Sequence, residues 1–135
     1  IPLDPISRES AIEFIAGSHQ WGKHFKPQSF TGEYYDHEDS KEEVLPDIDS
    51  HREDYNILGW ALEPGDAIAF NYLTIHGAPG NLSKEHSRRA VSFRWLGDDA
   101  VYMNRGGKTS PQYPHLISVL TTGDPLPEDE FPFVA

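Results

Sequence analysis

The stretch that decides the fold runs from Leu62 to Trp95 and reads LEPGDAIAFNYLTIHGAPGNLSKEHSRRAVSFRW. Aromatic and β-branched residues gather over 67–75 and over 88–96, so the sequence predicts a strand in each range. Glycine and proline lie between the two ranges and predict a turn there. His76 follows the first range directly, and Arg88 opens the second. The stretch therefore predicts two neighbouring strands that carry a histidine and an arginine near their connecting turn.

Two further strands are predicted, over 11–16 and over 57–62. A Glu-Pro-Gly-Asp turn at 63–66 follows the second of them, because proline suits the second position of such a turn and glycine the third. One more strand or a short helix is expected at 116–120. Short strands joined by Gly/Pro turns indicate an all-β (mainly β) fold, as in a sandwich, jelly roll or barrel.

The chain has 135 residues, which fits a single domain over 1–135. It has no apolar run of the roughly 18 residues that a membrane span needs, so we expect no membrane partner. It has no cysteine, which excludes disulfides and thiolate metal sites and fits a cytoplasmic location. The first residues, Ile-Pro-Leu, resemble part of a strand and predict that the chain begins inside a larger natural protein.

Negative charge is concentrated in one segment. The net charge of the chain is −11. Residues 33–54 contain ten acidic side chains against Lys41 and Arg52, a local charge of −8. Such a segment repels phosphate, which argues against a nucleic-acid partner. We interpret an insert of about residues 33–56 as a solvated loop, either a lid or a disordered segment, because it is longer than most connections in compact domains.

His76 is a candidate metal ligand, because neutral imidazole commonly binds divalent transition metals in proteins. Alternation along the predicted strand places Phe70, Tyr72 and Thr74 on the same face as His76. The alternative interpretation is a structural histidine, which is the more frequent role of a histidine that stands alone.

Arg88 is a candidate anchor for an acidic small molecule. A guanidinium on a barrel strand can hold a carboxylate through two hydrogen bonds. Alternation puts Arg88 and Arg89 on opposite faces of the predicted strand. The alternative is a surface arginine that pairs with the many acidic side chains of the chain.

Together these residues are more specific than either alone. The run GD(x)3F(x)5HG(x)3N(x)6RRA, from Gly65 to Ala90, resembles the phytanoyl-CoA dioxygenase family of Fe(II)/2-oxoglutarate oxygenases. The Ala-Gly-Ser-His segment at 16–19 resembles the PGSH segment of that family, with alanine in place of proline. The tail over 94–116 also resembles the C-terminal end of some members.

The resemblance implies a double-stranded β-helix, a jelly-roll and cupin-like fold, here incomplete at the N-terminus. It implies Fe(II) held by a His-x-Asp pair on an early strand and by a distal histidine, which by position is His76. It implies that Arg88 binds the far carboxylate of 2-oxoglutarate. Arg88 is preferred to Arg89 because it stands two residues before Ala90, as in the R-x-A pattern of the family. The activity implied is the hydroxylation of a small organic substrate.

The sequence departs from the family pattern at its start. The early His-x-Asp motif should precede the segment at 16–19, so it is expected before Ile1. This chain is therefore expected to be a C-terminal portion that is inactive alone. His-Glu-Asp at 37–39 has the right letters but lies after that segment, and we interpret it as a coincidence. Ala78 replaces a serine that helps to hold 2-oxoglutarate in many members, and Asn81 matches a turn asparagine.

A non-catalytic β-sandwich module that binds a ligand or partner is the alternative function. A barrel without its first strands has unpaired edges, so we also expect a homodimer. The three tryptophans, Trp21, Trp60 and Trp95, are predicted to be core or pocket-lining residues, with the core as the first expectation.

Overall fold

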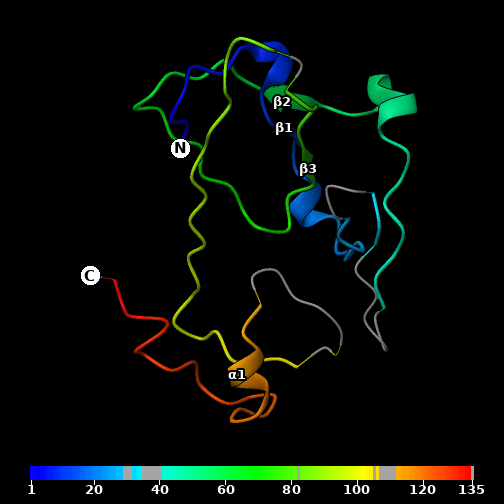
Figure 1. Cartoon of the computed structure of the whole chain (residues 1–135). Coiled ribbons are helices and arrows are strands. Elements are labelled where there is room, and N and C mark those ends of the chain that lie inside the picture. The colour runs from blue at the N-terminus through cyan, green and yellow to red at the C-terminus, as the bar shows by residue number, and fades with distance from the viewer. Residues whose placement is uncertain (29–31, 35–40, 82, 105, 107–111, 135) are drawn as a thin grey trace. The chain divides into compact units, whose positions relative to one another are not determined.

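The structure is a computed structural model (Figure 1), which describes residues 1–28, 32–34, 41–81, 83–104, 106 and 112–134. The chain divides into two compact units. The first unit comprises Ile1–Phe25 and Glu43–Phe93, and the second comprises Lys26–Glu42 and Arg94–Ala135.

A three-stranded antiparallel sheet forms the centre of the first unit (Figure 1). Its strands are β1 (Glu13–Ile15), β2 (Ile57–Gly59) and β3 (His76–Gly77), in the order β2-β1-β3. The predicted strands over 11–16 and 57–62 contain β1 and β2, although both observed strands are shorter. The sheet and the small amount of helix are consistent with a mainly β protein.

Phe14 lies at the centre of this sheet. It is paired with Leu58 of β2 on one side and with His76 of β3 on the other. Directly paired residues project from the same face, so these three side chains share one face of the sheet. Phe14 is 5% exposed, whereas Leu58 is 38% exposed. The buried apolar residues of this unit are Ile6, Ala11, Phe14 and Ile15.

The opposite face of the sheet carries an ion-pair cluster around Glu13. The Glu13 carboxylate accepts hydrogen bonds from Arg8 and Arg52, each with a distance of 2.9 Å. Burial alone would raise the pKa of Glu13, but the hydrogen bonds from Arg52 and Arg8 outweigh it and hold the pKa below its usual value. Gly59 leaves room for the Arg8 guanidinium, because a Cβ at that position would lie 2.8 Å from its central carbon and the arginine side chain would have to shift.

The first four residues pair with the segment that follows Arg88. The amide of Leu3 donates to the Arg89 carbonyl, and the amide of Val91 donates to the Ile1 carbonyl. Asp4 accepts three hydrogen bonds from Arg89, one from its backbone amide and two from its guanidinium. The hydrogen bond and charge of the Arg89 side chain lower the pKa of Asp4 from 3.8 to about 2.

Short 3-10 helices occupy the connections of the first unit. They are η1 (Arg8–Ser10), η2 (Ser18–Gln20) and η3 (Asp49–Asp54). The predicted Glu-Pro-Gly-Asp turn is confirmed, since the Asp66 amide donates to the Glu63 carbonyl and Gly65 has a φ of 108°. None of the helices in the described ranges has the length and apolar composition that a membrane crossing requires.

The predicted strand over 67–75 is wrong. A turn interrupts it, in which the Thr74 amide donates to the Asn71 carbonyl over 2.8 Å. The Asn71 side chain also accepts a hydrogen bond from the Leu73 amide over 2.9 Å. Asparagine satisfies neighbouring backbone groups in this way and competes with the strand ladder. Within the predicted strand over 88–96, the backbone pairing seen among the described residues is that of residues 89–91 with residues 1–3.

The three tryptophans are not core residues, which corrects the first expectation for them. Trp21, Trp60 and Trp95 are 39%, 47% and 72% exposed. The pocket-lining interpretation holds for Trp21 and Trp60, which line the two surface hollows described below.

The second unit contains the helix α1 (Pro114–Ile117), drawn in orange in Figure 1. It lies where a strand or a short helix was expected, and it begins at Pro114 because proline suits the first helical position. Leu116 is 3% exposed. The Tyr102 amide donates to the Asp124 carbonyl, so the segment near Val101 pairs with the one that follows Gly123.

The Asp4–Arg89 contact predicts a specific acid sensitivity. Because the folded pKa of Asp4 lies below its unfolded value, the contact contributes stability that is complete above about pH 4 and is lost as the pH falls toward 2. Asp4→Asn should therefore unfold at lower urea concentration at neutral pH and lose less stability on acidification. Urea unfolding at a series of pH values measures this, with Asp98→Asn as the matched control. An unchanged pH profile in Asp4→Asn would contradict the prediction.

Candidate functional site

His76 opens β3 and lies beside Phe14 of β1. The predicted strand over 67–75 stopped just before this histidine, whereas the observed strand begins with it. The pairing with β1 places the imidazole on the sheet face that also carries Phe14 and Leu58. The side chain of His76 is exposed, so a ligand can reach it.

A closed set of three hydrogen bonds fixes the backbone just before His76. The Ile15 amide donates to the Ile75 carbonyl over 2.9 Å. The Ile75 amide donates to the Ser18 hydroxyl over 2.8 Å, and this hydroxyl donates to the Ile15 carbonyl over 2.9 Å. Ser18 is 3% exposed. Its position depends on Gly17, whose φ of 77° lies in the left-handed region that glycine adopts without strain.

The imidazole of His76 is oriented by its own chain. Its Nδ1 lies 2.7 Å from the Thr74 carbonyl oxygen. A carbonyl oxygen only accepts hydrogen bonds, so Nδ1 must carry a proton and donate it. In the neutral ring, Nε2 is then left with a lone pair, which is the form in which histidine binds a metal.

Two aromatic rings border His76. The ring centroid of Phe70 lies 4.9 Å from that of His76, and the centroid of Phe14 lies 6.1 Å from it. Phe14 and Phe70 are themselves 4.8 Å apart. The three rings form one cluster, which restricts the rotation of the imidazole and shields one side of it from water.

A hollow of about 240 Å³ lies on this side of the sheet. Its apolar wall includes both phenylalanines that border His76. The lining residues are Phe14, Ile15, Ala16, Gly17, His19, Leu58, Trp60, Ile68, Ala69, Phe70, Asn71 and Thr74. The hollow therefore shares its walls with the cluster around His76.

Arg88 joins two segments of the first unit through backbone carbonyls. Its Nη1 donates to the Ser10 carbonyl over 2.5 Å and to the Pro79 carbonyl over 2.6 Å. Both N–H groups of Nη1 are thereby used, whereas those of Nη2 and Nε make no hydrogen bond to the described residues. Arg89 differs, because its guanidinium is bound to the Asp4 carboxylate.

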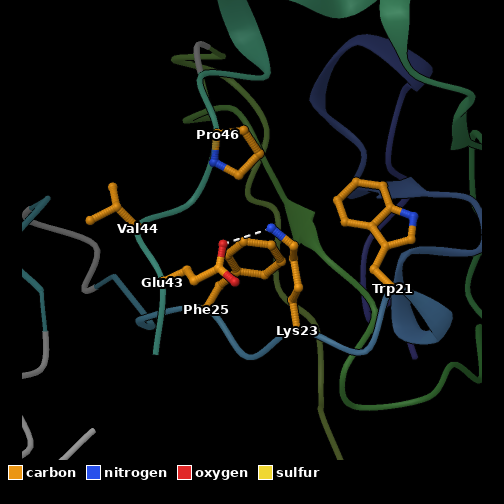
Figure 2. Close-up of a pocket in the computed structure, with 6 residues that line it drawn as sticks. All are labelled: Trp21, Lys23, Phe25, Glu43, Val44 and Pro46. Carbon is orange, nitrogen blue, oxygen red and sulfur yellow. Dashed lines mark hydrogen bonds and ion pairs between the residues drawn. The ribbon is translucent and has the colours of Figure 1, made fainter. Parts of the chain in front are cut away.

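A larger hollow of about 410 Å³ has a different character (Figure 2). Its lining residues are Trp21, Lys23, Phe25, Glu43, Val44 and Pro46. Figure 2 shows the ion pair between Lys23 and Glu43, whose atoms are 2.7 Å apart. Neither hollow is lined by His76 or Arg88, but the smaller one is lined by the two rings that border His76, those of Phe14 and Phe70, and the larger one is not. The smaller hollow is therefore the better candidate for chemistry.

The described residues do not supply a complete metal site. Across the described ranges, no group of three or more His, Asp or Glu side chains is placed to hold a metal ion. His76 fits the role of one ligand, through its Nε2. The His-Glu-Asp letters at 37–39 lie outside the described residues.

Comparison with known proteins identifies the family of the chain. The family model for phytanoyl-CoA dioxygenase (PhyH) matches residues 1–90. The chain belongs to the phytanoyl-CoA dioxygenase family. No curated protein and no solved structure matches it. Members of the phytanoyl-CoA dioxygenase family are generally Fe(II)/2-oxoglutarate-dependent oxygenases, so an oxygenase-like function is supported.

The family match includes His76 and Arg88. It also includes Ser18, whose role the sequence did not indicate. Ser18 lies in the segment that resembles the PGSH motif, but only the structure shows its bond to Ile75. The signal was present in the motif, because a serine that follows a glycine turn can bind backbone groups. The partner could not be inferred, since it lies 57 residues away.

Ser18 predicts a measurable loss of stability. Ser18→Ala removes the hydroxyl and leaves the Ile75 amide and the Ile15 carbonyl without a partner, which should cost about 1–3 kcal/mol of unfolding free energy. Urea unfolding measures this loss, with the exposed Ser87→Ala as control. Equal stability of the two variants would show that the hydrogen-bond set does not hold the strand before His76.

Proposed function

We propose that this chain carries the distal half of an Fe(II)/2-oxoglutarate-dependent dioxygenase site that hydroxylates a small organic substrate. His76 is the proposed distal iron ligand. The observation that carries the proposal is the bond between Nδ1 of His76 and the Thr74 carbonyl, because it leaves Nε2 ready for a metal. The family match over residues 1–90 supports an oxygenase function of this kind.

Bound iron would supply the site at which molecular oxygen, the oxidant, reacts: one oxygen atom would enter the C–H bond of the substrate and the other would enter succinate as 2-oxoglutarate loses carbon dioxide. The residues of the chain would hold the imidazole of His76 in place and orient it. Thr74 fixes the proton on Nδ1 of His76, and the rings of Phe14 and Phe70 exclude water from one side of the imidazole.

Arg88 is the proposed anchor for the far carboxylate of 2-oxoglutarate. Its Nη1 is fixed by the carbonyls of Ser10 and Pro79, so the guanidinium is held in one orientation before a ligand binds. The N–H groups of Nη2 and Nε can then donate to a carboxylate. Arg89 is unsuited to this role, because Asp4 neutralises its charge.

The proposed fold of the whole domain is a double-stranded β-helix. The antiparallel sheet β2-β1-β3 supports it as one short part of such a fold. The expectation that a His-x-Asp pair before Ile1 provides the other iron ligands stays a prediction. The residues at 37–39 are the alternative source, and the first experiment below separates the two.

His76→Ala should weaken Fe(II) binding by the 135-residue chain at least about tenfold, because a metal ligand is lost. Calorimetry under anaerobic conditions measures the affinity, and His86→Ala is the matched control. Unchanged affinity in His76→Ala would overturn the proposed ligand. A loss of affinity in His37→Ala would place that residue in the ligand set, whereas no loss would favour ligands from elsewhere.

Arg88→Ala should weaken the binding of 2-oxoglutarate, measured with Fe(II) present, by about tenfold to a hundredfold. The reason is the loss of charge-assisted hydrogen bonds to the carboxylate. Arg89→Ala is the control and should bind 2-oxoglutarate as the unaltered chain does. Similar losses in both variants would indicate a general charge effect and would contradict the anchor.

A non-catalytic module is the second candidate function. It is favoured by the lack of a complete group of metal ligands within the described ranges. In that case the chain would bind neither Fe(II) nor 2-oxoglutarate, and no succinate would form. Succinate production that is lost in His76→Ala would exclude the module.

We also propose that the chain forms a homodimer. In the described sheet, β2 and β3 each have β1 as their one neighbour, so both have an outer edge that can pair with another chain. Light scattering at micromolar concentration should give twice the monomer mass of 15.2 kDa. A mass of one chain would contradict this proposal.

A further inference from the structure

We propose that the hollow beside His76 binds the apolar part of a small, uncharged substrate, and that this substrate is not a coenzyme A thioester. The inference rests on the proposed function, because it takes His76 as the metal ligand. It adds the chemical class of the substrate and the residues that select it.

The hollow and His76 are parts of one arrangement. Phe14 and Phe70 line the hollow, and both rings also border the imidazole of His76. Thr74 lines the hollow as well, and its carbonyl fixes the proton on Nδ1 of His76. His76 itself is not a lining residue, but a molecule that rests against these walls would contact the two rings that border its imidazole.

The walls favour an apolar molecule. Phe14, Leu58, Trp60, Ile68 and Phe70 supply apolar side chains. Trp60 and Phe70 are 47% and 44% exposed, so a bound apolar molecule would remove their rings from water. Together with Leu58, which is 38% exposed, they give the hollow an apolar surface that faces water.

The hollow has no charged partner to offer. Among the described residues, its polar side chains are those of His19, Asn71 and Thr74, and no Asp, Glu, Lys or Arg side chain lines it. A carboxylate or phosphate buried there would lose its hydration without a compensating ion pair. The polar side chains can instead orient a neutral group, such as a hydroxyl or an amide.

Size and charge both argue against a coenzyme A thioester. The hollow measures about 240 Å³, which is below the range of about 300–1,000 Å³ that is typical of sites for drug-sized ligands. Coenzyme A carries several phosphate charges, whereas this chain has a net charge of −11. The hollow in Figure 2 is larger, but it is lined by the Lys23–Glu43 ion pair.

The test compares three probes with the full chain: cyclohexanemethanol, cyclohexanecarboxylate and coenzyme A. The first two share one carbon skeleton and differ in charge. Methyl NMR spectra report the site, through Leu58 and Ile68 for the proposed hollow and through Val44 for the other one. The alcohol should shift the signals of Leu58 and Ile68, while the carboxylate should bind at least about tenfold more weakly. Coenzyme A should cause no shift there.

Phe70→Ala should weaken binding of the alcohol about tenfold, because one apolar wall is lost. Tyr72→Ala is the matched control, since it removes an aromatic ring from the same segment but outside the hollow. Equal binding of alcohol and carboxylate, shifts confined to Val44, or no difference between the two variants would each overturn the proposal.

The probe experiment is done without metal, so it does not depend on the iron site. If His76→Ala still bound Fe(II) as the unaltered chain does, the proposed function would fail while the apolar hollow could stand. If the alcohol failed to bind while His76→Ala lost Fe(II), the substrate class would fail and the proposed function would stand.

Discussion

The rest of the site depends on the way Ile75 is held. Its carbonyl accepts from the Ile15 amide, and its amide donates to the buried Ser18 hydroxyl. With both backbone groups bound, the chain must enter β3 at the next residue, which is His76. Unpaired buried backbone groups are costly, so this arrangement resists displacement. The left-handed turn at Gly17 is what brings the hydroxyl within reach.

From this constraint the chemical properties of the site follow in order. The fixed entry into β3 brings the imidazole of His76 against Phe14 and Phe70 and places Nδ1 at the Thr74 carbonyl. The tautomer suited to metal binding therefore results from backbone geometry and requires no nearby carboxylate. The same rings form one wall of the apolar hollow, so the orientation of the imidazole and the shape of the hollow have a common structural cause. Arg88 is held separately, through two carbonyls.

Local signals in the sequence predicted one turn correctly and missed another. The turn at 63–66 was predicted and is present, because proline and glycine impose its dihedral angles themselves. The strand over 67–75 failed, because Asn71 satisfies the amide of Leu73 and ends the extended segment. The prediction that Tyr72 and His76 share one face depended on this strand, which does not form. The exposed tryptophans show the same limit, since burial depends on what packs against a ring.

The sequence by itself determined the family, the two candidate site residues and the negative charge that argues against phosphate ligands. Only the tertiary structure decided how those residues are oriented. Ser18 and Ile75 are separated by 57 residues, and Arg88 and Ser10 by 78. Their hydrogen bonds form only after folding brings distant backbone groups together, and no local propensity encodes such a partner. The motif could identify His76 as a candidate, but its place beside Phe14 depends on a sheet built from separate parts of the chain.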